Sequence, residues 1–507
     1  MRFLFLLLSL NFFINCSGNK TLNNQLSKLS NLPVPARIEA LINTTDPAIN
    51  IGIKIISLTD NRVIYERNAD RYFTPASTIK LATVAAALYY LGPSYRFNTN
   101  IHADNFDTST GAIKNLYLEG SGDPSLMDHD LIHLAHELKQ QKIKTISGNI
   151  YIDDQVFDTT FWTKGAMWDD RKFGYNAPVS GLNLNYNRLQ IKTMASHKIN
   201  NPASVVATPA CGYIKVSSKA ITKNEKATNN LNLSILQNNQ EKAWANINHD
   251  GLSSGDHVFV NGHIAKNSSP NYFLLSIKDP GMLAGCFLRE QLMREGITFS
   301  GKILRKKTPT QAIRLASHQS RALSEALIDF TKISNNVATD SLVKAIAAQA
   351  GQKPASFAGG LKLINDFLTK QVGIPEGAIV NADGAGVSRY NLITPSQMVK
   401  LLHYAANHFS SGPEFMAAMP LAGQDGTLGA RLKAPHLAGN IRAKTGSLTG
   451  VSGLAGYFIG EHNKRYAFAI FINGFTGSLT KYKNLQDDIL ANILPQRDLP
   501  VESARAE

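Results

Sequence analysis

A long β-type segment in the middle of the chain places the strongest constraint on the fold. Between about residues 98 and 275, short strand-like stretches are separated by Gly, Asn, Asp and Ser. These stretches are NLYLEG, GNIYID, SVVAT, GYIKVSS, HVFVNG and YFLLSI. Short strands with frequent turn residues predict one or two mostly β modules. The segments on either side differ in character, so we expect the β-rich part to interrupt another domain.

The flanking segments combine helices and strands. Residues 50–58 and 61–67 alternate apolar and polar side chains around a turn, which predicts a β-hairpin. A helix is expected directly after Pro75. Further helices are expected at 279–296, 324–351 and 394–408, strands at 439–460 and 465–474, and a closing helix at 478–494. The predicted division is a signal peptide at 1–18, core parts at 19–97 and 276–498, an insertion at 98–275 and a tail at 499–507.

The N-terminus has the layout of an export signal. Arg2 precedes an apolar run at 3–14 and small residues at 16–18, and this run is shorter than the roughly 20 residues that span a bilayer. We expect cleavage near Gly18 and a periplasmic or otherwise exported protein. Lipidation at Cys16 is the alternative.

Composition and charge limit the function classes. The 507 residues are 43% hydrophobic and 18% charged, which suits a large folded core. The net charge of +14 is distributed; it is either a solvated basic surface or favours peripheral association with cell-wall polymer or lipid head groups. Without a zinc-ligand spacing, phosphate loop or nucleic-acid motif in the sequence, we expect no metal, cofactor or nucleic acid. Cys211 and Cys286 either pair or remain thiols.

The Ser-x-x-Lys pattern occurs four times and has different meanings in different contexts. The matches are Ser17 and Lys20, Ser77 and Lys80, Ser341 and Lys344, and Ser478 and Lys481. The first lies at the signal boundary, the third inside an expected helix with core-facing positions, and the fourth at an expected N-cap. Ser77 opens a helix, so Lys80, one turn later, can reach its hydroxyl. The free N–H groups at a helix start also suit an oxyanion.

Two further motifs follow in a diagnostic order. Ser334, Asn335 and Asn336 lie in KISNNVATD, and IRAKTGSLTG contains Lys444-Thr445-Gly446 followed by Ser447. The order S-x-x-K, S-x-N, K-T-G is typical of β-lactamases and penicillin-binding proteins. Each motif is common by chance, but the three together predict one active site.

From about residue 30 to 490, the sequence resembles the D-alanyl-D-alanine carboxypeptidase/endopeptidase branch of the low-molecular-mass class C penicillin-binding proteins. Other family-like stretches are PASTIKL, GSGDPSL, YNAPVSGLNLNYN, NADGAGVSRYNLITP and LAGQDGTLGAR. The long gap between Ser77 and Ser334 also fits this branch. The resemblance implies an α+β fold, with a β-lactamase/transpeptidase-like core (an antiparallel sheet flanked by helices) and mostly β inserted domains. Asn335 stands where the branch often has Asp, and Ser447 where Thr is common.

The resemblance also implies catalytic roles. Ser77 would be the nucleophile and Lys80 its general base, made neutral by burial and by the nearby cation Lys444. Ser334 would relay a proton to the departing amine, and Asn336 would bind the substrate or orient Lys80.

Substrate contacts follow from the same resemblance. Lys444 and Thr445 would bind the terminal carboxylate of D-alanine, and Gly446 would let the strand approach the substrate. The backbone N–H groups of Ser77 and Ser447 would hold the oxyanion.

A second subsite is implied outside the three motifs. Arg389 would bind the carboxylate at the end of the wall peptide's side chain. Asp153 would bind its ammonium group, with the adjacent Asp154 as the alternative.

The expected function is a serine-type D-Ala-D-Ala carboxypeptidase, a D,D-endopeptidase, or both. It would act on peptidoglycan peptides through an acyl-enzyme and be inhibited covalently by β-lactams. The alternatives are a β-lactamase or esterase of the same fold and an inert peptidoglycan-binding scaffold. The balance between the two peptidase reactions and the oligomeric state stay open.

Overall fold

The computed structural model describes residues 32–224, 226–236, 256–408 and 410–494. The expected signal peptide, Cys16 and the tail at 499–507 lie outside these residues. The chain divides into two compact units. Unit 1 contains the chain up to Thr78, Ile393–Ala406 and the chain from Met419 onward, and unit 2 contains Ile79–Leu392 and Asn407–Ala418.

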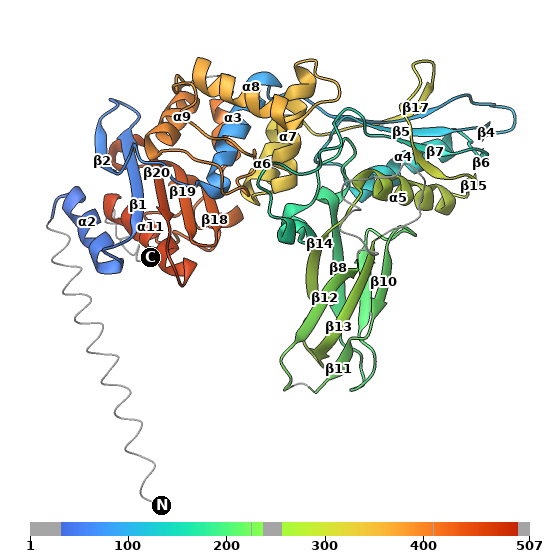
Figure 1. Ribbon diagram of the computed structural model, residues 1–507, viewed down its shortest axis with the longest axis horizontal. Coiled ribbons are helices and arrows are strands. Elements are labelled where there is room, and N and C mark those ends of the chain that lie inside the picture. Colours follow the sequence, from blue (N-terminus) through green and yellow to red (C-terminus); the bar gives the residue numbers. More distant parts are fainter. Residues whose placement is uncertain (1–31, 225, 237–255, 409, 495–507) are drawn as a thin grey trace, which may run out of the picture. The chain divides into compact units, whose positions relative to one another are not determined.

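Unit 1 is built on a five-stranded antiparallel sheet in the order β18-β19-β20-β1-β2 (Figure 1). Its strands are β1 (Asn50–Ser57), β2 (Val63–Arg67), β18 (Ile441–Leu448), β19 (Val451–Ile459) and β20 (Arg465–Asn473). The predicted hairpin is confirmed as β1 and β2, which pair in antiparallel fashion. Because β1 also pairs with β20, the front and the back of the chain form one sheet.

Helices flank this sheet. They are α2 (Val34–Thr45), α9 (Pro395–Asn407) and α11 (Leu479–Ile493). Ile51, Ile53 and Ile55 alternate along β1 and are fully buried, in one apolar core with residues of α2 and α11. This spacing of two places them on one face of the strand. The Tyr457 hydroxyl of β19 donates to the Leu402 carbonyl of α9 at 2.6 Å. An antiparallel sheet flanked by helices confirms the α+β class.

One part of unit 2 is a group of helices packed around the apolar helix α3 (Lys80–Tyr90). The others are α6 (Leu323–Lys332), α7 (Asn336–Gln349), α8 (Phe357–Lys370) and α10 (Gly412–Ala417). Residues 80–88 of α3 are all buried, and α3 contacts α6, α7 and α8 (Figure 1). A helix that is apolar all round is buried in this way.

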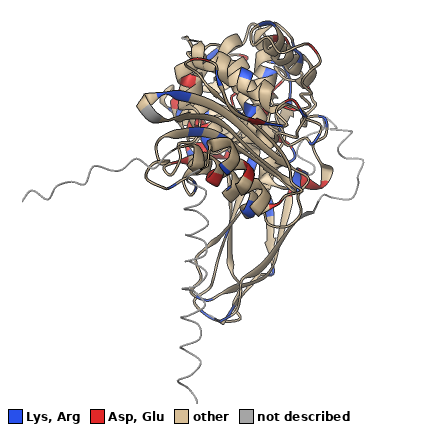
Figure 2. Ribbon diagram, turned by 90° about the vertical axis from the view of Figure 1, so that its left-hand side faces the viewer, with Lys and Arg blue, Asp and Glu red and all other residues tan. Residues whose placement is uncertain are grey.

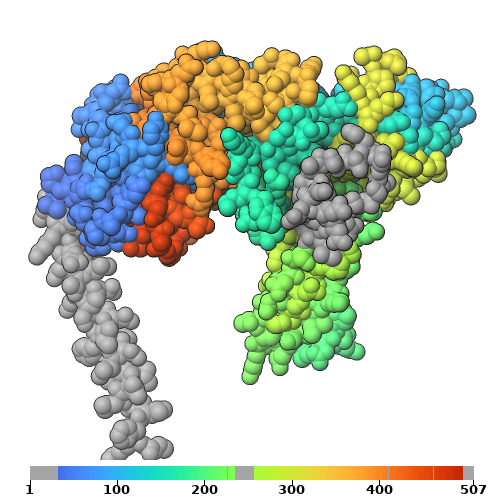
Figure 3. All heavy atoms as spheres, in the orientation of Figure 1, coloured from blue at the N-terminus to red at the C-terminus, as the bar shows by residue number. Residues whose placement is uncertain are grey.

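The rest of unit 2 carries a five-stranded mixed sheet in the order β16-β7-β5-β3-β17. The strands are β3 (Asn98–Ala103), β5 (Leu116–Gly120), β7 (Ile150–Asp153), β16 (Ile303–Arg305) and β17 (Ile313–Gln319). Helices α4 (Asp128–Gln140) and α5 (Pro280–Arg294) contact it and each other. In Figure 3 the light-blue residues near 100 lie beside the yellow ones near 315, as the pairing of β3 with β17 requires.

Smaller sheets complete unit 2. Strands β8 (Arg188–Met194), β9 (Ser204–Thr208) and β14 (Asn271–Ser276) form one. Strands β10 (Lys215–Ser218), β11 (Ile221–Lys223), β12 (Asn230–Leu236) and β13 (His257–Ala265) form another. Short strands β4 (Ala112–Ile113), β6 (Thr145–Ile146) and β15 (Thr298–Phe299) form a third. A disulfide between Cys211 and Cys286 answers the question that the sequence left open.

The structure differs from the sequence-based expectation in two helical segments, while the domain limits stay predictions. Across the predicted boundary after residue 275, β16 and β17 pair with β7 and β3. Helix α4 was not expected in a segment read as β. The single helix expected at 324–351 is wrong, because the chain breaks between α6 and α7.

The charge of the chain is spread over many elements. Lys and Arg residues (blue) and Asp and Glu residues (red) are scattered over many helices and strands (Figure 2). Within the described residues, every helix is too short or too polar to cross a bilayer.

Candidate active site

Ser77 lies in a strained helical turn of unit 1. The 3₁₀ turn η1 (Ala76–Ile79) leads directly into α3. The Thr78 hydroxyl donates to the Pro75 carbonyl at 2.7 Å. Ala76 has a φ of 48°, in the left-handed region that costs a residue with a Cβ roughly 1–2 kcal/mol. The surrounding structure holds this strain, and Ser77 is thereby fixed at the start of a helix, as the sequence predicts.

Strand β18 packs against the Ser77 turn at Gly446. A Cβ atom added at Gly446 would lie 2.6 Å from the Pro75 carbonyl oxygen and 3.0 Å from the Ser77 nitrogen. The strand therefore approaches the Ser77 backbone as closely as glycine allows. The sequence predicts Gly446 as the point of approach to a substrate, and the structure adds its approach to the turn that contains Ser77.

The other K-T-G residues line the same strand. Lys444 is fully buried, and its amine donates to the Thr445 carbonyl at 2.8 Å. The Thr445 hydroxyl is 2.8 Å from that of Thr427, in the 3₁₀ turn η6 (Gly426–Leu428). Ser447 is exposed at the end of the motif. Unit 1 thus holds the serine turn and the K-T-G strand in direct contact.

Lys80 is a fully buried amine in unit 2. Its Nζ donates to the Asn336 side-chain oxygen at 2.6 Å and to the Ala385 carbonyl. Burial lowers the Lys80 pKa to about 8, against the opposing charges of Asp340 and Asp383. An amine of lowered pKa is partly neutral near pH 7, as a general base requires.

The S-x-N motif lies in the break between α6 and α7. Ser334 has a φ of 58°, which ends the first helix. Asn335 is the N-cap of α7, and its side chain accepts from the Ala338 N–H at 3.0 Å. The Asn336 side chain, besides accepting from Lys80, donates to the Tyr175 carbonyl at 2.8 Å. The structure therefore brings Lys80 and Asn336 together and links Asn336 to the inserted module.

Asp383 organises the loop that ends in Arg389. Its carboxylate accepts from the Gly386 N–H at 2.6 Å and from the Asn391 side chain at 2.8 Å, and also from the Ser388 N–H. Ser388 is buried and Arg389 is exposed. A fixed loop thus presents the Arg389 side chain at the surface of unit 2.

The two acids predicted for the second subsite have structural partners. The Asp153 carboxylate is largely buried and accepts from the Thr308 N–H at 2.6 Å. Asp154 forms an ion pair with Arg305 at 3.1 Å. Both contacts join β7 to the segment around β16.

The sequence reasoning passed over a third acid in this region. Asp170, in the 3₁₀ turn η2 (Trp168–Lys172), is hydrogen-bonded to the Tyr175 side chain. Burial, followed by this bond, raises the Tyr175 pKa. Because the Tyr175 backbone binds Asn336, Asp170 is tied to a motif residue. The signal was available in the sequence, where Asp169 and Asp170 shortly precede a family-like stretch.

Two other Ser-x-x-Lys matches have structural roles. The buried Lys344 amine forms an ion pair with Asp158 at 2.7 Å and donates to the Thr160 carbonyl at 2.7 Å. Ser341 is fully buried in α7. Ser478 occupies the N-cap position of α11 as predicted, but its side chain makes no capping bond.

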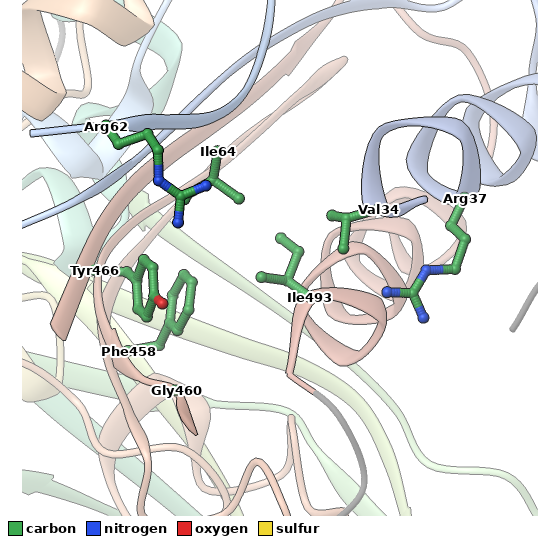
Figure 4. Close-up of a pocket in the computed structure, with 8 residues that line it drawn as sticks. All are labelled: Val34, Arg37, Arg62, Ile64, Phe458, Gly460, Tyr466 and Ile493. Carbon is green, nitrogen blue, oxygen red and sulfur yellow. The ribbon is translucent and has the colours of Figure 1, made fainter. Parts of the chain in front are cut away.

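A pocket of about 380 Å³ in unit 1 lies apart from these motifs. Arg62 and Ile64 face the stacked rings of Phe458 and Tyr466, with the ends of α2 and α11 opposite (Figure 4). None of its lining residues belongs to the three motifs.

Comparison with known proteins decides the family. The model of the D-Ala-D-Ala carboxypeptidase 3 (S13) family matches residues 35–493. The chain belongs to this family. It is therefore a serine-type D-Ala-D-Ala carboxypeptidase, and the resemblance seen in the sequence is confirmed.

Individual relatives cover nearly the whole chain. The D-alanyl-D-alanine carboxypeptidase DacB of Haemophilus influenzae is 32% identical over 463 residues, 90% of this chain and 92% of the relative. The D-alanyl-D-alanine carboxypeptidase of Actinomadura sp. (strain R39) is 30% identical, covering 87% of this chain and 81% of the relative. The crystal structure of penicillin-binding protein 4 (dacB) from H. influenzae matches with a TM-score of 0.76 and 29% identity, over 90% of this chain and 99% of that one. The same protein has been solved in complex with a β-lactam.

Proposed function

We propose that this carboxypeptidase is exported and acts on peptidoglycan peptides through an acyl-enzyme on Ser77, and that β-lactams acylate the same serine. It removes a terminal D-alanine, cleaves D-alanyl cross-links, or does both, because either reaction presents a D-alanyl amide to the nucleophile. The N-terminal export signal in the sequence and the β-lactam complex of the H. influenzae relative support this proposal.

The observation that carries the proposal is the state of Lys80. The amine is buried, bonded to an amide oxygen of the S-x-N motif, and three residues after Ser77 at the start of a helical segment. A serine hydroxyl is a weak nucleophile without an adjacent base. Burial lowers the pKa of the Lys80 amine to about 8, and this favours Lys80 as that base.

Acylation and deacylation follow with balanced proton transfers. Lys80 takes the Ser77 proton while the serine oxygen bonds to the carbonyl carbon of the penultimate D-alanine. Ser334 passes a proton from Lys80 to the departing amine nitrogen as the C–N bond breaks. Water then hydrolyses the ester and regenerates the Ser77 hydroxyl.

Backbone and cationic groups stabilise the charges in this reaction. The N–H groups of Ser77 and Ser447 hold the oxyanion, each donor worth roughly 3–4 kcal/mol. Lys444 and Thr445 bind the terminal carboxylate. The close packing of Gly446 on the Ser77 turn supports this assignment, since it fixes the strand relative to the first donor.

Arg389 binds the side-chain carboxylate of the wall peptide in this proposal. For the ammonium group, the contacts favour Asp170 over the predicted Asp153, because Asp153 is largely buried and holds the Thr308 backbone. Asp170 is half-buried and linked through Tyr175 to Asn336. Replacing Asp170 by Asn should raise KM for such peptides, whereas Asp153→Asn should lower stability.

The deciding experiment combines a labelled penicillin with Ser77→Ala. The natural chain should form a persistent adduct on Ser77 and release D-alanine from a muropeptide, and Ser77→Ala should lose both, with activity falling at least about 1000-fold. Rapid penicillin turnover without an adduct would indicate a β-lactamase instead. Equal D-alanine release by the two proteins would defeat the assignment, and fragments from cross-linked peptidoglycan would measure the endopeptidase share.

A further inference from the structure

A short backbone segment, Asp383–Gly386, is bonded from two helices of unit 2. From α3, the Thr83 hydroxyl donates to the Gly384 carbonyl at 2.9 Å, and the Lys80 amine donates to the Ala385 carbonyl. From α7, Asp340 accepts the Gly384 N–H at 3.0 Å and also the Ala385 N–H. Both residues are therefore held through their N–H and their C=O groups at once.

Close packing shows that this segment has little room to move. A Cβ atom added at Gly384 would lie 2.3 Å from a Val343 methyl carbon and 3.3 Å from the Asp340 carboxylate. These contacts are with α7, and a third is with the Thr83 hydroxyl of α3 at 3.1 Å. The segment that carries the Ala385 carbonyl is therefore packed between α3 and α7, and Asp340 holds it from the α7 side.

Asp340 follows Asn336 by one helical turn, so the two side chains share a face of α7. Asn336 binds the Lys80 amine directly. Asp340 binds the backbone segment whose Ala385 carbonyl accepts from the same amine. The charged groups that interact with Asp340 are Lys80 of α3, Asp383 of the loop and Lys344 of α7 itself. Lys344 is already paired with Asp158.

We propose that Asp340 is the positioning residue of the general base. It fixes the Ala385 carbonyl against Lys80, and its charge acts on the buried amine. This inference deepens the proposed function, on which it rests.

The charges around the pair agree with this role. Burial and the neighbouring Asp383 raise the Asp340 pKa, while burial lowers that of Lys80. The Asp383 carboxylate beside this pair accepts three N–H bonds. The charge of Asp340 opposes the effect of burial on the Lys80 pKa, so a carboxylate at this position stabilises the ammonium form. Two such interacting groups titrate as a pair.

The test is the pH dependence of Ser77 acylation by a labelled penicillin in Asp340→Asn. Asparagine keeps the shape and one acceptor oxygen but cannot carry negative charge. Without a carboxylate beside it, the Lys80 ammonium form is less stable, so the acid limb of the profile should move to lower pH by about one unit. Asp340→Ala, which also releases the segment, should in addition lower the plateau rate about tenfold or more.

Asp123→Asn is the matched control, since Asp123 is a buried carboxylate of unit 2 held by Ser125. Its acid limb should coincide with that of the natural chain. A coincident limb in folded Asp340→Asn would overturn this inference alone, whereas absence of a Ser77 adduct in the natural chain would overturn the proposed function. If Asp340→Asn does not fold, Thr83→Val tests the same segment from α3. It should slow acylation several-fold without moving the limb, and an unchanged rate would contradict the positioning role.

Discussion

At the scale of single residues, the proposed function depends on the protonation of Lys80. Desolvation is the largest influence on its pKa, and two nearby carboxyl groups only partly oppose it. The sequence suggested Lys444 as a second cause, and that contribution stays a prediction. The amine donates to an amide and a carbonyl oxygen, which bind its neutral form as well as its charged form.

The pH profile of the natural chain tests this state. A base must be unprotonated, so the acylation rate should increase with pH and level off above the Lys80 pKa of about 8. Below that pH we expect close to a tenfold rise per unit. Stopped-flow measurement with labelled penicillin, corrected for spontaneous hydrolysis, gives the profile. A rate independent of pH between about 6 and 9 would rule out Lys80 as the titrating base.

Gly446 should tolerate no side chain. In Gly446→Ala the new methyl group would press on the Pro75 carbonyl and the Ser77 nitrogen, displacing the nucleophile's turn from β18. A displacement near 1 Å costs up to about 100-fold in rate, so we expect acylation to slow by roughly 10–100-fold.

Gly429→Ala is the control for this prediction. A Cβ atom there would lie 3.6 Å from its nearest neighbours, an ordinary contact distance, and its rate should stay close to that of the natural chain. Equal rates in the two variants would show that the approach of β18 to the serine turn is unimportant.

At the scale of elements, the break between α6 and α7 is the decisive feature. Apolar spacing continues across residues 324–351, which is why a single helix is predicted there. The left-handed Ser334 and the Asn335 N-cap interrupt it. The break places Ser334 before a helix start and directs Asn336 toward Lys80.

Asn335 should contribute chiefly as a cap. Asn335→Ala removes the acceptor for the Ala338 N–H and should lower the free energy of unfolding by about 1–2 kcal/mol. Asn335→Asp, the residue common in the resembling branch, keeps a capping oxygen and should change stability much less. Chemical denaturation of both variants measures the difference, and an Asp variant as unstable as the Ala variant would argue against capping.

At the scale of the whole molecule, unit 2 joins a helical part to a large inserted module. The segment around Asp158 is bound to α7 by Lys344, and Tyr175 is bound to Asn336. The module that carries Asp170 is thus connected to the helix that carries the S-x-N motif.

The disulfide should stabilise the module without taking part in the chemistry. Cys211 and Cys286 are 75 residues apart in the sequence, and closing a loop of this size is worth about 2–4 kcal/mol. The double variant Cys211→Ser, Cys286→Ser should unfold at correspondingly lower urea concentration but acylate Ser77 at a normal rate. Reductant should destabilise the natural chain and leave the variant unchanged; identical unfolding curves for the two proteins would contradict the prediction.

The sequence by itself determined the features that depend on neighbouring residues. The β1–β2 hairpin follows from alternation around a short turn, and α11 follows from helical spacing in 478–494. The same local logic could have found α4, where Leu131, Leu134 and Leu138 have helical spacing, but the β-type surroundings obscured it. The three motifs and their order identify the family because the chemistry requires those residue types.

Only the tertiary structure decided which groups are buried and which partners they contact. Lys80 and Lys344 look equivalent as Ser-x-x-Lys matches, yet one amine binds Asn336 and the other binds Asp158. The sequence could not show that the Thr308 N–H donates to Asp153, the acid predicted for the second subsite. These partners are far apart in the chain, and the energy of a buried charge depends on such distant groups, so no local pattern contains it.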